Sequence, residues 1–125
     1  MDKYYLNLTF TGKCQTFVGR MPAYPGGHVV EVGIGFVTHE IMHALGFYHE
    51  HNRYDRDQYL KIIWKNIQPG YEKNFQKNTK MDADTYGTPY DPCSVMHYGE
   101  TSFGHINHYG SKVLKKLKIL TNWTN

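Results

Sequence analysis

The stretch HEIMHALGFYH, residues 39–49, decides how this chain folds. Residues four apart lie on one face of a helix, so His39 and His43 can present two imidazoles to a single metal ion. Gly46 is the natural end of that helix, because glycine adopts the left-handed conformation that closes a helical turn. The chain then reverses and brings His49 back to the same ion as a third ligand.

This spacing predicts a catalytic rather than a structural metal site. Three protein ligands and an open fourth position are typical of catalytic zinc, whereas four ligands close a structural site. We therefore predict one Zn²⁺ per chain, with the three histidines as ligands. Glu40 follows the first ligand and can reach a water at the metal, so it is the candidate general base, which later delivers the proton to the leaving amine.

The alternative is a surface helix with incidental histidines. The two helical histidines, the intervening glutamate, the glycine and the third histidine coincide by chance in roughly one of ten thousand sequences of this composition. The motif therefore outweighs the alternative.

The pattern around the motif predicts mixed structure. Partial alternation and turn residues indicate strands before the motif, and apolar positions three or four apart indicate the helix itself. Pro69 favours a helical first turn later in the chain. In chain order the predicted elements are strands at 4–10, 16–19 and 28–32, a helix at 36–45, an extended segment at 59–64, a short helix from 69 to 77 and a loop at 78–92.

Composition sets limits on the class of protein. With 125 residues, 40% apolar and 20% charged, the chain forms at most one soluble globular domain. The net charge of +3 calls for neither nucleic acid nor an anionic membrane as a partner. No apolar run has the length of a membrane span, and no secretory leader is visible. Cys14 and Cys93 pair with each other, stay free or lack their partners; the spacing leaves these alternatives open.

Several further stretches, together with the zinc motif, make residues 4–103 resemble the astacin family of metzincin proteases. Tyr54 is a small departure, since most members have proline there. The stretches that carry the resemblance are GFYHEHNRYDRD (46–57), WKNIQPG (64–70), NF (74–75), SVMHYG (94–99), GKC (12–14) and VGR (18–20).

The resemblance implies an α/β (α+β) metzincin-like fold, with a small twisted sheet over the zinc helix and an irregular lower subdomain. It implies that Met96 forms a hydrophobic floor under the ligands. It implies that Tyr98 is an extra ligand that swings away and stabilises the oxyanion. Glu50 would meet a mature amino terminus through water, or else be a solvated carboxylate. Residues 28–32 would be an edge strand that aligns a peptide substrate.

The chain also departs from the family pattern and resembles a member shortened at both ends. We expect an incomplete catalytic domain at residues 1–103 and a basic tail at 104–125. The segment before the motif is short, so we expect the zinc helix to start a turn late and Cys14 to lack its usual partner. Leucines at helical spacing among the lysines of residues 111–125 predict a basic amphipathic helix, with one packed face or, less commonly, a membrane- or calmodulin-binding role.

The leading hypothesis is a zinc-dependent endopeptidase acting on peptide or protein substrates, with no nucleic-acid partner and no membrane expected. The resemblance implies an extracellular location. One alternative is a catalytically inactive zinc-binding fragment, and another is a module that holds peptides on its edge strand. Arg53, Asp55, Arg56 and Asp57 are expected to form an ion-pair and capping cluster. The histidines expected at the surface or in packing, not as ligands, are His28, His51, His97, His105 and His108.

Overall fold

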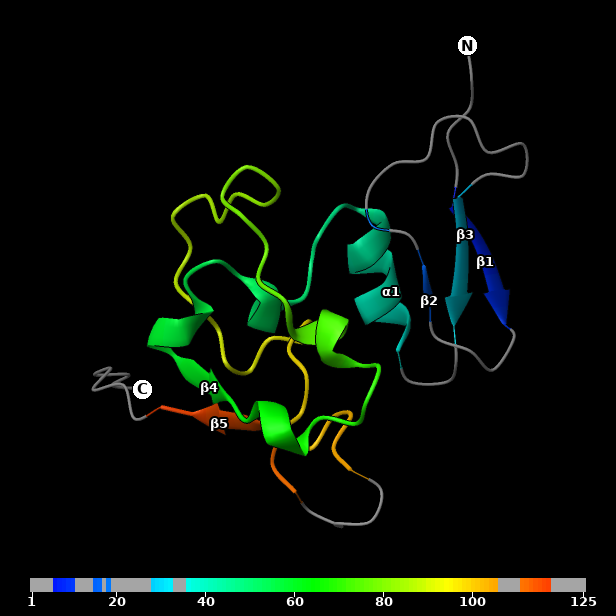
Figure 1. Cartoon of the computed structure of the whole chain (residues 1–125). Helices are drawn as coiled ribbons and strands as arrows, with labels where there is room; N and C mark the ends of the chain where they lie inside the picture. The colour runs from blue at the N-terminus through cyan, green and yellow to red at the C-terminus, as the bar shows by residue number, and fades with distance from the viewer. Residues whose placement is uncertain are drawn as a thin grey trace. The chain divides into compact units, whose positions relative to one another are not determined.

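The computed structural model describes residues 6–10, 15–16, 18, 28–32, 36–105 and 111–117 (Figure 1). The chain divides into two compact units, Met1–Tyr48 and His49–Asn125. Cys14, His108 and the last eight residues of the basic tail lie outside the described residues, so the predictions made for them stay predictions.

The first unit contains a three-stranded mixed sheet. Its strands are β1 (Leu6–Phe10), β2 (Gln15–Thr16) and β3 (His28–Val32), in the order β1-β3-β2. Strand β3 runs parallel to β1 and antiparallel to β2. The strand predicted at 28–32 is confirmed, and so is the described part, 6–10, of the one predicted at 4–10. The strand predicted at 16–19 shares only Thr16 with β2, and Val18 lies in a bend.

The expectation that residues 28–32 form an edge strand is wrong for the described sheet. Strand β3 has a hydrogen-bonded neighbour on each side, and β1 and β2 occupy the edges. Alternation reports which side chains share a face of a strand, whereas the neighbours of that strand depend on non-local pairing. The hypothesis of a peptide-binding module, which needed this edge, therefore loses its basis.

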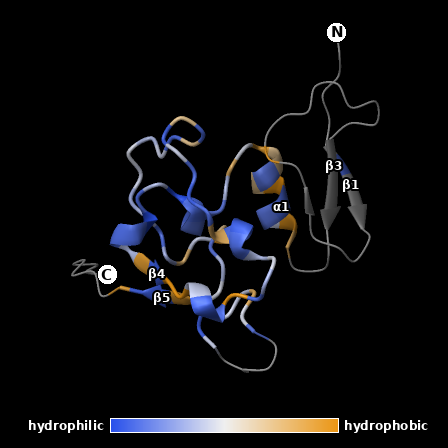
Figure 2. Ribbon diagram, viewed as in Figure 1, coloured by the Kyte–Doolittle hydropathy of each residue, from blue (hydrophilic) through white to orange (hydrophobic). Residues whose placement is uncertain are grey.

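Helix α1 (Val37–Ala44) carries the first part of the zinc motif and packs against β3 and β2. The helix carries both hydrophilic and hydrophobic residues, as the blue and orange parts of α1 show (Figure 2). The Gly46 amide donates to the His43 carbonyl at 2.9 Å, and the Phe47 amide donates to the Met42 carbonyl at 3.0 Å. With Gly46 at φ 101°, these two bonds form a Schellman motif, so the predicted helix end is confirmed.

The second unit is mostly irregular, with short helices and one small sheet. Strands β4 and β5 pair antiparallel, with Leu60 opposite Lys116, and an isolated bridge joins Ile67 to Gly104. Within the described residues, one α-helix with small sheets, short 3-10 helices and long irregular segments matches the predicted α+β class. The elements of this unit are η1 (Glu50–Asn52), η2 (Arg56–Gln58), β4 (Leu60–Ile62), η3 (Trp64–Asn66), η4 (Glu72–Phe75) and β5 (Leu114–Lys116).

The helix predicted for the basic tail is wrong where the tail is described, because Leu114–Lys116 is strand β5. Val113 and Leu114 are buried, whereas Lys115 and Lys116 are exposed. Pairing with β4 and burial of these two apolar residues outweigh the helical spacing, since tertiary context routinely overrides local preference.

The core of the second unit lies around the β4–β5 pair, where Figure 2 shows hydrophobic residues on β4 and at the start of β5. Burying each large apolar side chain contributes about 1.5–3 kcal/mol. Within the described residues, no helix has both the length and the apolar character needed to cross a membrane. The core residues are Leu60, Ile62, Ile67, Phe75, Tyr90, Val113 and Leu114.

Candidate metal centre

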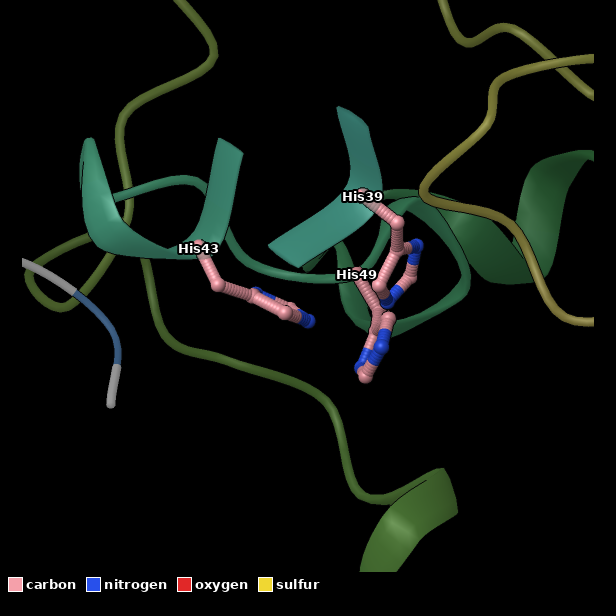
Figure 3. A group of neighbouring side chains, drawn as sticks. All are labelled: His39, His43 and His49. Carbon is pink, nitrogen blue, oxygen red and sulfur yellow. The ribbon is translucent and has the colours of Figure 1, made fainter. Parts of the chain in front are cut away.

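The side chains of the three histidines of the zinc motif lie close together. His39, His43 and His49 each offer a ring nitrogen, and these atoms lie within 4.8 Å of one another. Figure 3 shows the three imidazoles converging. Tetrahedral zinc, with Zn–N distances of about 2.0–2.1 Å, holds its ligand nitrogens roughly 3.3 Å apart. Modest ring rotations bridge that difference, so the donor set fits zinc.

The turn that ends α1 also orients one of the ligands. His43 Nδ1 lies 2.8 Å from the carbonyl oxygen of Phe47, which can only accept, so Nδ1 carries the hydrogen. Nε2 of His43 is then the nitrogen with a lone pair for a metal. Burial lowers the pKa of His43, only partly opposed by the Phe47 hydrogen bond, and this favours the neutral, ligating form.

Glu40 is buried on the same helix, with 4% of its surface exposed. Burial raises the pKa of its carboxyl, and the neighbouring His39 opposes the rise. Its Oε2 has no hydrogen-bond partner among the described residues. A buried carboxylate oxygen left in this state is costly, and a water or a cation at the histidine cluster would satisfy it. This is a second observation, independent of the histidines, that fits a metal with its water.

The third histidine lies within an aromatic cluster. The ring centroids of His49 and Tyr98 are 4.6 Å apart, and those of His51 and Tyr98 are 4.0 Å apart. Phe75 and Phe103 flank the other sides of Tyr98. The structure therefore brings Tyr98 next to His49, as the resemblance implied.

A main-chain hydrogen bond joins Met96 to Glu50, the residue after the third histidine. Met96 is 2% exposed, and its carbonyl accepts a hydrogen bond from the Glu50 amide at 2.9 Å. The Met96 segment is therefore tied to the residue that follows His49. The burial of Met96 agrees with its predicted packing role.

Glu50 has partners within its own unit. Its Oε1 accepts from Arg53 Nη1 at 3.1 Å and from the Asp91 amide at 2.8 Å. The alternative of a merely solvated carboxylate is therefore wrong, because the carboxylate joins two segments of the irregular region.

The predicted ion-pair cluster is confirmed, and its centre is buried. Arg53 pairs with Asp55 at 2.8 Å, and Asp57 pairs with both Arg56 at 3.0 Å and Lys77 at 2.6 Å. Arg56 is 3% exposed. The capping role considered for Asp57 is not what the structure shows, since its carboxylate is engaged in these two pairs.

The sequence did not predict the burial of His51 or the hydrogen bonds of His97. His51 is fully buried, and His97 contacts Tyr90 and Tyr98 through its two ring nitrogens. Both were expected only as surface or packing residues. Neither belongs to the metal cluster found in the described part of the chain. Cys93 is exposed and free in the described residues, and its pairing with Cys14 stays a prediction, since Cys14 lies outside them.

Comparison with known proteins agrees with the geometry. The family model for astacin, which describes a family of peptidases, matches residues 1–118. The chain is similar to the low choriolytic enzyme of Oryzias latipes, with 46% identity over 82% of this chain and 38% of that protein. It is also similar to meprin A subunit beta of Mus musculus, with 41% identity over 79% of this chain and 14% of that protein.

A solved structure gives the same result for the fold. High choriolytic enzyme 1, a hatching enzyme zinc-protease from Oryzias latipes, superposes with a TM-score of 0.75 at 33% identity, covering 95% of this chain and 59% of that one. The chain thus spans 59% or less of the length of each of these relatives. Over the length it does span, the family match, the metzincin-like fold and the three-histidine cluster agree, and the chain belongs to the astacin family of zinc metallopeptidases.

Proposed function

We propose that this chain is a zinc-dependent endopeptidase that hydrolyses peptide bonds in peptide or protein substrates. The observation that carries the proposal is the convergence of three histidine nitrogens within 4.8 Å, with buried Glu40 on the helix that supplies two of them. Family membership supports the same reaction class. We also propose an extracellular location, because the family resemblance implies one.

The three histidines would hold the metal. Bound zinc would supply Lewis-acid chemistry, acidifying a water and polarising the carbonyl of the scissile bond. His43 is held for this task by its Nδ1–H bond to Phe47, which leaves Nε2 for the ion.

Glu40 would move the proton. Its carboxylate follows the first ligand and is withdrawn from solvent, which raises its pKa toward the range useful for a general base. It would take a proton from the attacking water and return it to the leaving amine nitrogen, so no covalent intermediate with the protein forms.

Tyr98 would stabilise the negative charge that develops on the carbonyl oxygen. A phenol donor close to the third ligand suits that task, since donors placed where charge develops give large rate effects. Its ring lies 4.6 Å from that of His49 and contacts the ring of Phe103, which supports a place beside the metal. As the family resemblance implies, Tyr98 would also be an extra ligand to the metal that swings away to the oxyanion.

Hydrolysis of a quenched generic peptide by the purified chain tests the proposal. Zinc content and circular dichroism are measured on the same preparation. We expect turnover that stops with chelator and returns with added zinc. No turnover from folded protein that holds one zinc per chain would contradict the proposal and leave the alternative, an inactive zinc-binding fragment.

A further inference from the structure

We propose that His51 and His97 are positioning residues that hold the backbone of Tyr98 from both sides, an arrangement called here the Tyr98 clamp. The inference rests on the proposed function, in which Tyr98 acts beside the metal. It adds two residues to which no role in the site has been assigned.

His51 holds the amide side of Tyr98. It is fully buried, and its Nε2 lies 3.1 Å from the carbonyl oxygen of Asn74. A carbonyl oxygen only accepts, so Nε2 carries the hydrogen and Nδ1 is left with a lone pair. The Tyr98 amide donates to that Nδ1 at 3.4 Å, a long hydrogen bond. The same imidazole thus joins residue 98 to the η4 segment.

His97 holds the carbonyl side. Its Nδ1 lies 2.7 Å from the carbonyl oxygen of Tyr98, so Nδ1 carries the hydrogen. Its Nε2 then accepts the hydrogen bond from the Tyr90 hydroxyl, also at 2.7 Å. Tyr90 is 4% exposed and stacks on Tyr59 with 4.6 Å between ring centroids. The second half of the clamp is therefore anchored in the core.

His51 also touches the third metal ligand. Its ring stacks on that of His49, with centroids 5.2 Å apart and 28° between the planes, and lies 4.0 Å from the ring of Tyr98. The carbonyl of His51 accepts from buried Arg56 Nη1 at 2.9 Å. The buried His51 side chain thus contacts both the third ligand, His49, and the proposed oxyanion donor, Tyr98. The hydrogen bond from Arg56 holds the backbone of His51.

The consequence is functional as well as structural. A displacement of about 1 Å of a catalytic group can cost about a hundredfold in rate. If His51 only filled the core, loss of either of its hydrogen bonds would lower stability in a similar way. If His51 positions Tyr98, loss of the bond to the Tyr98 amide lowers kcat, whereas loss of the bond to the Asn74 carbonyl does not.

Two substitutions at one position separate these bonds. In His51→Asn, the amide oxygen takes the place of Nδ1 and can still accept from the Tyr98 amide. In His51→Gln, the amide nitrogen takes the place of Nε2 and can still donate to the Asn74 carbonyl. His105→Phe is the control, because it removes another histidine bonded to a backbone carbonyl, that of Lys65 at 3.2 Å.

The variants are compared by kcat and KM with zinc bound, and by hydrogen exchange of the Tyr98 amide in the zinc-free chain. We expect kcat within about threefold of the unsubstituted chain for His51→Asn, and a fall of about tenfold or more at unchanged KM for His51→Gln. Tyr98 amide exchange should speed up in His51→Gln alone, and the His105→Phe control should match the unsubstituted chain in both measurements.

Equal kcat and equal Tyr98 exchange in His51→Asn and His51→Gln would overturn the clamp. If neither variant folds, Tyr90→Phe decides, since it keeps the ring and removes only the bond to His97. There the clamp predicts a kcat several-fold lower at unchanged KM and zinc content, and an unchanged kcat would overturn it. Absence of turnover in the unsubstituted, zinc-loaded chain would instead overturn the proposed function, while the exchange comparison still decides the clamp.

Discussion

The imidazole ring of His49 lies 4.6 Å from the phenol ring of Tyr98, with 55° between the two planes. These residues come from the end of the zinc motif and from the segment after Met96, far apart in the sequence. Their contact places a phenol beside the third ligand, and it is made by the protein side chains alone. The role of that phenol in the reaction can be tested separately from zinc binding.

Removing the Tyr98 hydroxyl should slow the reaction without releasing the metal. For Tyr98→Phe we expect kcat to fall about a hundredfold to a thousandfold, because a donor to the developing oxyanion is lost while the ring packing stays. Steady-state kinetics and zinc content measured together check this. Unchanged kcat in a variant with full zinc content would contradict the role.

Gly46 should matter for zinc affinity because it directs the chain from α1 back to His49. Its φ of 101° is a conformation that alanine adopts only at a cost of about 1–3 kcal/mol. Gly46→Ala should therefore weaken zinc binding and lower stability, as measured by chelator competition and urea unfolding. Gly99→Ala is the control, since an added Cβ there meets Ser102 Oγ at an ordinary 3.6 Å. Equal effects of the two changes would contradict the prediction.

Buried Arg56 should be a major source of stability in the second unit. Its Nη1 donates to the carbonyls of His51 and Phe75, and its Nε pairs with Asp57. Arg56→Met leaves those carbonyls without their donor, so we expect a loss of about 2–4 kcal/mol in urea unfolding. Lys77→Met removes the other cation from Asp57 but at an exposed site, and should cost less than about 1 kcal/mol. A small effect at Arg56 would show that the network does not stabilise the fold.

Acid should destabilise the zinc-free chain through His51. Burial, followed by repulsion from His49, lowers the pKa of His51 from 6.5 to about 3, against the opposing Asn74 hydrogen bond. The unfolded chain therefore binds more protons between these pH values. The stabilisation is complete above pH 6.5 and is lost as the pH falls toward 3.

The size of this effect is on the order of several kcal/mol, since a tenfold change in proton affinity corresponds to about 1.4 kcal/mol. Urea unfolding at a series of pH values with chelator present measures it. His51→Asn lacks the titrating group, so its stability should change less between about pH 6.5 and pH 4.5. Identical slopes in the two proteins would contradict the assignment.

The local parts of this molecule could be predicted from the sequence because local physics sets them. Helix α1 follows from apolar spacing, and Gly46 ends it through a Schellman motif that depends on residues within one turn. The ligand cluster follows for the same reason, since His39 and His43 share a helix face and His49 comes just after the turn.

The parts that could not be predicted depend on distant partners. Strand β5 pairs with β4, and nothing in the spacing of Leu114 and Leu117 distinguishes that strand from a helix. The central place of β3 likewise depends on its neighbours. The burial of His51 and Arg56 arises from contacts with the 74–75 segment, and polar side chains carry no periodic signal of such burial.

The measurement that tests the central claim most directly is the turnover of Glu40→Gln, assayed beside the unsubstituted chain with one zinc per chain in both. Glu72→Gln, an exposed carboxylate whose contact is with the Gly70 amide, is the matched control. We predict that Glu40→Gln keeps its zinc and fold and loses at least about a hundredfold in kcat, while the control is unchanged. Normal turnover by zinc-loaded Glu40→Gln would contradict the account of this site as a metal centre with a glutamate base.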